Sequence, residues 1–413
     1  MKIIQVNTVC GRGSVGRIVV DLYNMIQNAG DLPVAAYGRG DAPADVNGFL
    51  IGNKADFCIH VLRNFFRGES GFGSKAVTER FITWLKEQEP DVIHLHNIHG
   101  FYLQTERLFD YLKEAGIPVV WTLHDCWPFT GHCAYFDYSS CDKWKTGCHD
   151  CAQHAKVYPY ALFCDNSKQA YLRKKEAFAG VENLTVVTPS RWLAKLVGQS
   201  FLRDYPVQVI PNGIDLGQFQ PTVLSEKSAL FSQIYGGSID RSKKLLLGVA
   251  NVWEHRKGLS YFKELAGRLP DDTRIVLVGT SRKQQKEIAK EFAKDRLLAV
   301  GRTENVKELA ALYTLADVYV NLTLEDNFPT TNLEALACGT PVVTFDTGGS
   351  RESLNPDCGY VVPKGDTAAA LEVIGDCLHR TKPVQACLKR GADFDKKKCF
   401  QAYLDLYHQW NDK

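Results

Sequence analysis

The chain contains two successive series of short apolar segments, each alternating with stretches of helical periodicity. The first series opens with a β-branched run at residues 2–6, and apolar side chains then recur at helical spacing from Ile18 to Ile26. Further strand patterns lie at residues 92–95, 119–123, 184–188 and 207–210, with helical patterns between them at residues 75–87 and 107–115. Because strands that alternate with helices are typical of parallel sheets, this part of the chain predicts an α/β domain.

A second series of the same kind begins near residue 245. Its strand patterns lie at residues 245–250, 275–279, 297–300, 318–321, 341–344 and 359–362. Between the two series, the turn at residues 211–215 contains Pro and Gly and is followed by polar residues to about Arg241. A chain of 413 residues exceeds what one hydrophobic core usually organises. We therefore expect two α/β domains and place the linker in this stretch.

The last apolar pattern is a helical stripe at Phe400, Tyr403, Leu404 and Tyr407, which follows the charged run at residues 396–398. An apolar face on a helix needs an apolar surface to pack against. The terminal helix is therefore expected to dock on one of the two domains.

The composition limits the class of protein. The hydrophobic fraction of 45% and the charged fraction of 23% are those of a globular chain. A net charge of +2 gives no reason to expect nucleic acid as a partner. No apolar run approaches the roughly 18 to 20 residues of a membrane-spanning helix, and the first residues are too polar for a signal peptide. We expect a cytoplasmic protein whose cysteines stay reduced.

A segment between a predicted strand and a predicted helix carries the most specific pattern. It comprises Asp326, Asn327, Phe328, Pro329, Thr330, Thr331 and Glu334. A helix start presents unpaired backbone N–H groups and the positive end of the helix dipole, which suit a diphosphate. Glu334, one turn into the helix, is placed to accept hydrogen bonds from ribose hydroxyls. A capped helix start with a solvent-facing glutamate is equally compatible with this spacing.

This segment resembles the acidic-x7-acidic signature of the family 4 retaining glycosyltransferases with the GT-B fold. Residues 324–329 and 333–343 are similar to those of a bacterial subgroup that builds capsule, lipopolysaccharide and colanic acid. Asp326 takes the place of the first acidic residue, with Glu325 beside it. The resemblance extends along nearly the whole chain, from the N-terminal glycine loop to the segment at residues 345–349.

The resemblance implies a fold of two Rossmann-like, doubly wound domains that face a central cleft. The acceptor-binding domain would comprise residues 1–213 and a C-terminal helix, residues 396–413, that returns to it. The nucleotide-sugar-binding domain would comprise residues 214–395.

The resemblance also implies roles for individual residues. Those expected to bind the donor are Gly13, Arg256, Lys257, Asn327, Phe328, Pro329, Thr330, Thr331 and Glu334. Those expected in a loop beside the acceptor are Gly11, Ser14 and Gly16. Those expected at the catalytic centre are His124, Glu325 and Asp326, with His124 in contact with the transferred sugar. Without the resemblance, each group has a simpler explanation. Arg256 and Lys257 would be a solvated cation pair, the glycines would form a tight turn, and His124 would be a core histidine.

Two groups of side chains invite a metal. The cysteines at positions 133, 141, 148 and 151 are spaced C-x7-C-x6-C-x2-C, and four such thiolates can close a structural zinc site. Two disulfides or free thiols are the alternatives to zinc at Cys133, Cys141, Cys148 and Cys151. His94, His96 and His99 also have the chemistry of ligands, but His94 and His96 alternate along a strand and suit a structural or cleft-lining role better.

The segment at residues 60–67 is apolar and basic, which suits the surface of an anionic membrane. An ordinary amphipathic helix has the same pattern.

These features together predict a retaining glycosyltransferase that moves a sugar from a UDP- or GDP-sugar to a hydroxyl of a glycan. The resemblance implies a lipid-linked acceptor, cell-surface polysaccharide synthesis and a place in the cytoplasm or at the inner membrane face. No catalytic metal is expected, because fixed cations and helix N–H groups stabilise a leaving diphosphate. A sugar-nucleotide epimerase of the same architecture and a catalytically silent nucleotide-sugar-binding subunit are the alternatives.

Overall fold

The computed structural model describes residues 1–225, 230, 232, 234 and 243–410, and the chain divides into two compact units. The first unit comprises Met1–Pro211 and Cys399–Lys413, and the second comprises Asn212–Lys398. The sequence placed these limits at residues 213 and 395. Part of the expected linker, which extends to about Arg241, and the last three residues of the expected terminal helix lie outside the described residues.

The first unit is built on a seven-stranded parallel sheet of order β3-β2-β1-β4-β5-β6-β7. Its strands are β1 Lys2–Asn7, β2 Leu32–Tyr37, β3 Gly48–Leu50, β4 Val92–Leu95, β5 Val119–Thr122, β6 Leu184–Thr188 and β7 Val207–Val209. Ile3, Ile4 and Val6 of β1 are completely buried, as in a parallel strand with helices on both faces. The sequence patterns did not reveal β2, which contains Pro33, or β3, which is only three residues long.

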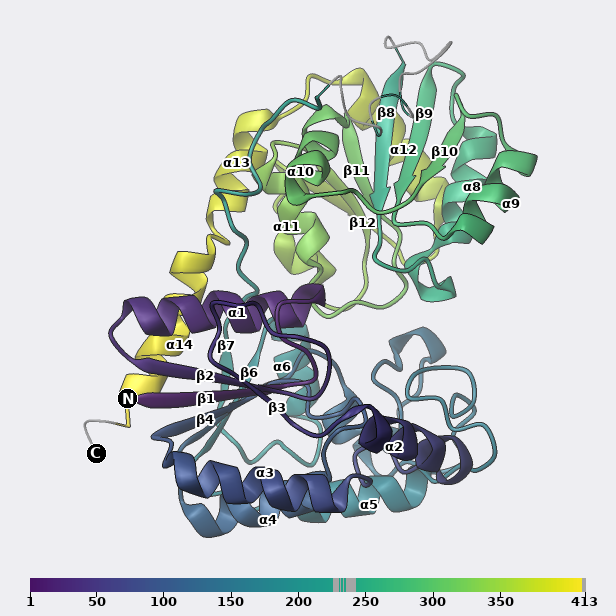
Figure 1. Ribbon diagram of the computed structural model, residues 1–413. Coiled ribbons are helices and arrows are strands. Elements are labelled where there is room, and N and C mark those ends of the chain that lie inside the picture. The colour runs from purple at the N-terminus through teal and green to yellow at the C-terminus, as the bar shows by residue number, and fades with distance from the viewer. Residues whose placement is uncertain (226–229, 231, 233, 235–242, 411–413) are drawn as a thin grey trace. The chain divides into compact units, whose positions relative to one another are not determined.

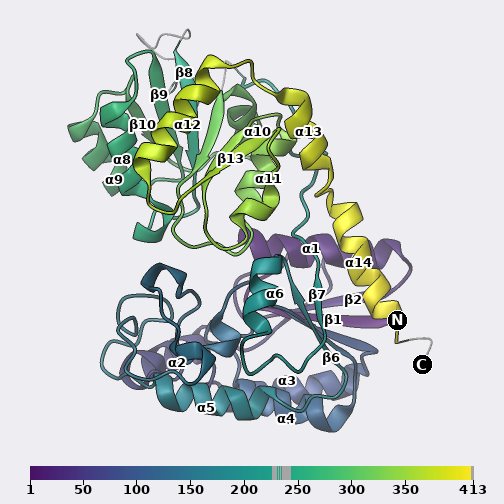
Figure 2. The same ribbon diagram turned by 180° about the vertical axis from the view of Figure 1, so that it is seen from behind.

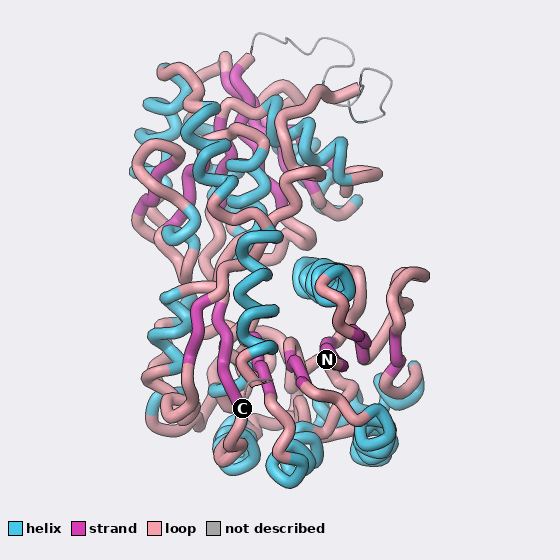
Figure 3. Tube along the Cα trace, turned by 90° about the vertical axis from the view of Figure 1, so that its left-hand side faces the viewer, coloured by secondary structure: helices cyan, strands magenta, loops and turns pink. Residues whose placement is uncertain are grey.

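Helices cover both faces of this sheet. They are α1 Gly13–Asn28, α2 Lys54–Arg67, α3 Lys75–Gln88, α4 Thr105–Ala115, α5 Ser167–Phe178, α6 Arg191–Val197 and the terminal α14 Lys396–His408. Helices α3, α4 and α5 lie on one face, and α1 and α14 lie on the other (Figure 1). Figure 3 shows the strands of this unit between these helices.

The terminal helix packs on the first unit. Its apolar stripe is buried in one core with Ile3, Val92, Val120 and Val187, which come from four neighbouring strands, and with side chains of α1. The stripe consists of Phe400, Tyr403, Leu404 and Tyr407, each at most 4% exposed. The expected return of the C-terminal helix to the N-terminal domain is therefore confirmed.

The second unit is built on a six-stranded parallel sheet of order β10-β9-β8-β11-β12-β13. Its strands are β8 Lys244–Val249, β9 Thr273–Val278, β10 Leu297–Val300, β11 Val318–Asn321, β12 Val342–Phe345 and β13 Gly359–Val362. Its helices are α8 Leu259–Arg268, α9 Arg282–Glu291, α10 Val306–Leu315, α11 Thr330–Ala337, α12 Thr367–His379 and α13 Val384–Ala392. Helices α8, α9 and α12 share one core beside the sheet, and α10, α11 and α13 share another (Figure 2).

Both sheets are doubly wound. In each, the strand order reverses direction beside the first strand, between β1 and β4 in the first unit and between β8 and β11 in the second. Loops that leave two such strands at their carboxyl ends diverge, and open α/β sheets bind their ligands in the resulting crevice. The fold class predicted from the sequence is confirmed, and it directs attention to these two places.

Candidate active site

In the second unit, charged and polar side chains gather at the carboxyl ends of β8 and β11. We call this group the β8/β11 site, and it consists of Arg256, Lys257, Glu325, Asp326, Asn327 and Glu334. Arg256 and Lys257 lie in a short 3₁₀ turn, His255–Lys257, that follows β8. The acidic residues follow β11, so the parallel pairing of these two strands brings the two segments to the same edge.

Lys257 and Asp326 form an ion pair across the two loops. The distance from Lys257 Nζ to Asp326 Oδ2 is 2.7 Å, and the two side chains remain 23% and 19% exposed. Partly exposed ion pairs contribute little to stability. The pair therefore positions a cation at the strand ends where solvent, and hence a ligand, can reach it.

Arg256 fastens the two loops together. Its Nη1 donates a hydrogen bond to the backbone oxygen of Glu325 at 3.3 Å, and its own backbone oxygen accepts one from the amide of Leu324 at 2.7 Å. Its Nε lies 3.3 Å from Glu254 Oε2. The guanidinium is held by these contacts beside the ion pair of Lys257.

Helix α11 begins at this edge of the sheet. Pro329 takes the N-cap position, and in the described chain no side chain caps the start of this helix. The first turn contains no acidic residue that would offset the positive end of the helix dipole. Uncapped N–H groups at a helix start suit an anion.

Glu334 is buried inside this unit, with 3% of its surface exposed. The hydroxyl of Tyr313 donates a hydrogen bond to Glu334 Oε2 at 2.8 Å. Burial, together with the nearby charge of Glu334, raises the pKa of Tyr313 well above its usual value, so this tyrosine stays a donor. Glu334 is therefore not the solvent-facing side chain of the alternative interpretation.

Two glycines allow the loops of this site to pack closely. A Cβ added to Gly258, whose φ is +78°, would lie 2.1 Å from the backbone oxygen of Leu322. A Cβ added to Gly348, whose φ is +53°, would lie 1.7 Å from the backbone oxygen of Asp326. Side chains at these positions would push apart the loops that carry Lys257 and Asp326.

In the first unit, the β1/β4 site comprises the glycine segment that leads into α1 and the histidines near the ends of β4 and β5. Gly11 lies before α1, and its amide donates a hydrogen bond to the oxygen of Gly16 at 2.9 Å. Gly13, Ser14 and Gly16 lie in the first turn of α1, so the expected acceptor loop is partly helical. As at α11, no described side chain caps α1, and its first turn holds no acidic residue. This helix start is thus also open to an anion.

His124 is partly exposed and follows β5. Its Nε2 lies 3.1 Å from His96 Nδ1, and His96 Nε2 lies 3.3 Å from Gln5 Oε1. Burial lowers the pKa of His124 to about 4, and it lowers the pKa of His96 further below its usual value. Both imidazoles are consequently neutral near pH 7 and act as hydrogen-bond donors and acceptors rather than as cations.

The terminal helix is hydrogen-bonded to this histidine group. His94 Nδ1 lies 2.6 Å from the hydroxyl of Tyr407, and His94 Nε2 lies 2.8 Å from Thr122 Oγ1. The rings of His94 and His96 are 4.0 Å apart. The sequence did not reveal this connection from α14 to His124, because no local pattern links residues about 300 positions apart.

The remaining histidine of the group contacts a carboxylate. His99 Nε2 lies 2.8 Å from Asp125 Oδ2, and the amide of Trp127 donates to Asp125 Oδ1 at 2.9 Å. His99 Nδ1 lies 3.0 Å from the hydroxyl of Tyr158. His94, His96 and His99 thus have protein partners that hold their rings in place.

Two family models match the chain. Residues 15–218 match the model described as Glycosyltransferase Family 4, and residues 243–380 match the model described as Glycosyl transferases group 1. WcaC of Escherichia coli K12, named as a colanic acid biosynthesis glycosyl transferase, is 22% identical over 98% of this chain and 99% of its own length. The chain belongs to the family 4 glycosyltransferases.

Two other proteins are similar to this glycosyltransferase, one in sequence and one in structure. An N-acetylgalactosaminyltransferase of Campylobacter jejuni, whose name specifies a diphospho-undecaprenol-linked acceptor, is 28% identical over 50% of this chain and 55% of its own. HepE of Anabaena, solved in complex with UDP-glucose, has a TM-score of 0.65 and 14% identity over 99% of this chain and 100% of that one. The structural likeness supports the GT-B type of fold.

The structure places the sequence-predicted residues of this glycosyltransferase in two groups. Lys257 contacts Asp326, and Arg256 contacts the backbone of Glu325, so these four lie together. Gly13 belongs to the first unit and the other residues expected to bind the donor belong to the second. Sequence reasoning gave no role to Asn332 of this segment. Asn332 accepts a hydrogen bond from Asn321 at 2.8 Å and donates one to Ser353 at 3.0 Å, and so anchors α11 beside β11.

The four clustered cysteines of the glycosyltransferase line one cavity of about 330 Å³ in the first unit. Cys133 Sγ and Cys151 Sγ are 3.9 Å apart. Among the described residues, no group of three or more His, Cys, Asp or Glu side chains is already arranged around a common point as metal ligands are.

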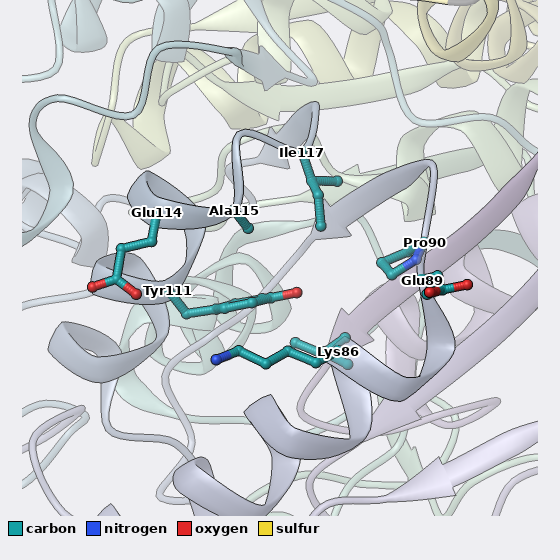
Figure 4. A pocket seen from close by; sticks show the side chains of 8 residues that line it. Lys86, Glu89, Pro90, Tyr111, Glu114, Ala115 and Ile117 are labelled. Atoms are coloured by element: carbon teal, nitrogen blue, oxygen red, sulfur yellow. The ribbon is translucent and has the colours of Figure 1, made fainter.

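Another cavity of the first unit, about 570 Å³ in volume, lies at the C-terminal ends of α3 and α4. Figure 4 shows Tyr111 and Lys86 facing each other across it, with the Lys86 Nζ 5.8 Å from the centre of the tyrosine ring. It adjoins Pro90 and Ile117, which precede β4 and β5, and so lies at the opposite strand ends from His124. Its position at the amino ends of the strands gives it no part in the sites described above.

A membrane-spanning segment was not expected from the sequence. Within the described residues, none of the helices combines the length and the apolar character that crossing a bilayer requires.

Proposed function

We propose that this enzyme is a retaining glycosyltransferase that moves a sugar from a nucleoside diphosphate to a hydroxyl of a glycan. The β8/β11 site carries this proposal, because it combines the cation of Lys257, the uncapped start of α11 and the buried carboxylate of Glu334 at one edge of one sheet. A diphosphate needs positive charge and N–H donors, and ribose hydroxyls need an acceptor. UDP and GDP both meet this description.

The proposed chemistry follows from where charge develops. When the bond between the anomeric carbon and the diphosphate oxygen breaks, its electron pair stays on that oxygen. Lys257, Arg256 and the N–H groups at the start of α11 stabilise the negative charge that grows there. The acceptor oxygen then bonds to the anomeric carbon on the face that the diphosphate leaves, and the acceptor proton departs with the diphosphate. We assign neither a side-chain nucleophile nor a divalent metal to this step.

The other residues take supporting roles in this proposal. Those around the donor are Asn327, Phe328, Pro329, Thr330 and Thr331, and those beside the leaving group are Glu325 and Asp326. His124 contacts the transferred sugar as a neutral imidazole, in keeping with its lowered pKa. Gly11, Gly13 and Gly16, with Ser14, approach phosphate or acceptor through their backbone.

The names of similar proteins support a place in cell-surface polysaccharide synthesis. WcaC is named for colanic acid biosynthesis, and the Campylobacter enzyme is named for a lipid-linked acceptor. HepE was solved with UDP-glucose, a donor of the proposed class. We therefore propose a lipid-linked glycan as the acceptor.

A lipid-linked acceptor requires access to a membrane surface, and α2 offers one. Its exposed side chains include Ile59, Leu62 and Phe66, which are 55–57% exposed, together with Arg63 and Arg67. Phe66 stacks on the 69% exposed ring of Phe163 at 5.0 Å between ring centres, so a second segment extends the apolar surface. We call Ile59, Leu62, Phe66, Leu162 and Phe163 the α2 patch.

Three large apolar side chains of α2 are exposed although the helix buries polar ones. The residues it buries fully are His60 and Asn64, whereas Ile59, Leu62 and Phe66 are more than half exposed. Asn64 Nδ2 donates a hydrogen bond to the oxygen of Tyr160 at 2.6 Å, which holds the helix in this orientation. Exposed apolar side chains beside arginines suit an anionic lipid surface, so we propose peripheral binding at the cytoplasmic face of the inner membrane.

Replacing both Leu62 and Phe66 by aspartate should lower binding to phosphatidylglycerol vesicles about tenfold or more. Burial of one such side chain contributes about 1.5–3 kcal/mol, and the added carboxylates repel the lipid. Cosedimentation measures the bound fraction. Leu32→Asp, at a 64% exposed leucine of the same unit, is the matched control and should bind as the original protein does. Equal binding of the double variant, or equal binding to phosphatidylcholine vesicles, would contradict the membrane role.

A thermal-shift panel of nucleoside diphosphates tests the donor site. UDP or GDP at about 100 times its dissociation constant should stabilise the native state by about 2.7 kcal/mol and raise the melting temperature. Nucleoside monophosphates, which lack the second phosphate, should have a smaller effect. Absence of any shift with every nucleoside diphosphate would remove the proposed donor class.

A further inference from the structure

The connection between β5 and α5 is a long segment of residues 123–166 with little regular structure. It contains only three 3₁₀ turns, Trp127–Phe129, Asp137–Ser139 and Lys143–Lys145, among its described elements. Connections of this length are uncommon in compact domains unless something besides secondary structure holds them. The loops beside α2 in Figure 1 belong to this segment.

Four thiols of this segment line one cavity. They are Cys133, Cys141, Cys148 and Cys151, and the cavity is about 330 Å³ in volume. The sulfur atoms of Cys133 and Cys151 are 3.9 Å apart. With zinc–sulfur bonds of about 2.3 Å, a tetrahedral site separates its sulfurs by about 3.8 Å. This first pair is therefore already at the spacing of two zinc ligands.

Two other buried polar atoms beside the cavity have no partner in the described chain. They are His132 Nε2 and Trp144 Nε1, and both residues line the cavity. The side chains of His132 and Trp144 are more than nine-tenths buried. The amide of Gly131 already donates a hydrogen bond to Cys148 Sγ at 3.1 Å. Hydrogen bonds of this kind to sulfur are what thiolates bound to a metal require around them.

A buried lysine lies near the same thiols. Lys174 is 1% exposed, and its Nζ donates hydrogen bonds to the backbone oxygens of Trp127 and Thr130 at 2.8 and 3.0 Å. Burial lowers the pKa of Lys174 well below its usual value, and Cys148, Asp125 and Cys133 act in the opposite direction. A buried ammonium is costly unless negative charge lies nearby, and four metal-bound thiolates would supply a net charge of about −2.

We infer that Cys133, Cys141, Cys148 and Cys151 bind one zinc ion, which holds the connection between β5 and α5 in place. Cys141 and Cys148 line the same cavity as the spaced pair. Binding requires these two side chains to turn toward the pair. The ion has no part in glycosyl transfer, so this inference stands apart from the proposed function.

The test uses the full chain, purified from zinc-supplemented cells under reducing conditions. Elemental analysis should find one zinc per chain, and p-mercuribenzoate should release it. Cys148→Ser should lose the zinc and melt at a lower temperature. Cys58→Ser and Cys164→Ser remove exposed cysteines outside the cluster and should keep the zinc and the melting temperature of the original protein.

A second measurement does not depend on the folding of a variant. Cobalt exchanged into the original protein should show the thiolate-to-Co²⁺ charge-transfer and d–d absorption of a tetrahedral tetrathiolate site. Three results would overturn the inference. The first is a zinc-free chain whose native mass is four hydrogens low, which indicates two disulfides. The second is a zinc-free chain with four readily alkylated thiols in the cluster. The third is zinc that survives in Cys148→Ser.

Discussion

Lys257→Ala is expected to weaken nucleoside diphosphate binding by about 10- to 100-fold, because a hydrogen bond to a charged group contributes about 1.5–3 kcal/mol. The rate of transfer should fall more, by about 100- to 1000-fold, because charge on the leaving diphosphate is greatest in the transition state. Lys257 follows β8, and its Nζ lies 2.7 Å from Asp326 Oδ2. Because this side chain is partly exposed rather than part of a core, the fold should survive its loss. Isothermal titration and initial rates measure the two effects.

Lys263→Ala is the matched control for this prediction. Lys263 is also a partly exposed lysine of the second unit, and it pairs with Glu291 on the neighbouring helix α9, away from the strand ends. The control should bind nucleoside diphosphate with unchanged affinity. Equal affinities in Lys257→Ala, Lys263→Ala and the original protein would remove Lys257 from the donor site.

Phe400→Ala should destabilise the first unit by about 3–5 kcal/mol, the usual cost of removing a buried phenylalanine from a core. Phe400 is 1% exposed and packs in the cluster that joins α14 to β1, β4, β5 and α1. Removal of the chain after residue 395 should have a larger effect, because it exposes the whole surface that α14 covers. Thermal unfolding measures both changes.

The same helix offers its own control and a functional readout. Gln401→Ala changes an exposed neighbour of Phe400 and should leave the melting temperature unchanged. Loss of α14 should impair transfer more than nucleotide binding, since Tyr407 supports His94 in the first unit while the β8/β11 site belongs to the second. Full transferase activity and an unchanged melting temperature after truncation would refute this dependence.

Periodicity was sufficient to predict two parallel α/β sheets and a docked terminal helix, whereas the family resemblance implied the doubly wound order and the domain on which this helix packs. Parallel strands buried on both faces are continuous apolar runs, and such a run is visible at residues 275–278. Strand β2 was not predicted because its apolar run contains Pro33, and β3 was not predicted because three residues show no period. Strand detection thus failed where the segment was short or lacked a backbone donor.

The sequence named candidate residues for the site but not their contacts. The ion pair of Lys257 with Asp326 follows from the parallel pairing of β8 with β11, because neighbouring parallel strands end at one edge. The burial of Glu334 against Tyr313 and the chain from Tyr407 through His94 to His124 depend on tertiary packing. Partners of this kind leave no local signal in a single sequence.

The central claim is transfer of a sugar, with retention, from a nucleoside diphosphate. The most direct measurement is NMR of the reaction of the purified enzyme with a nucleotide sugar and a lipid-diphosphate glycan acceptor. The account predicts one released nucleoside diphosphate for each new glycosidic bond, and a product with the anomeric configuration of the donor. An inverted product, or conversion of the nucleotide sugar into an epimer without any use of acceptor, would contradict it.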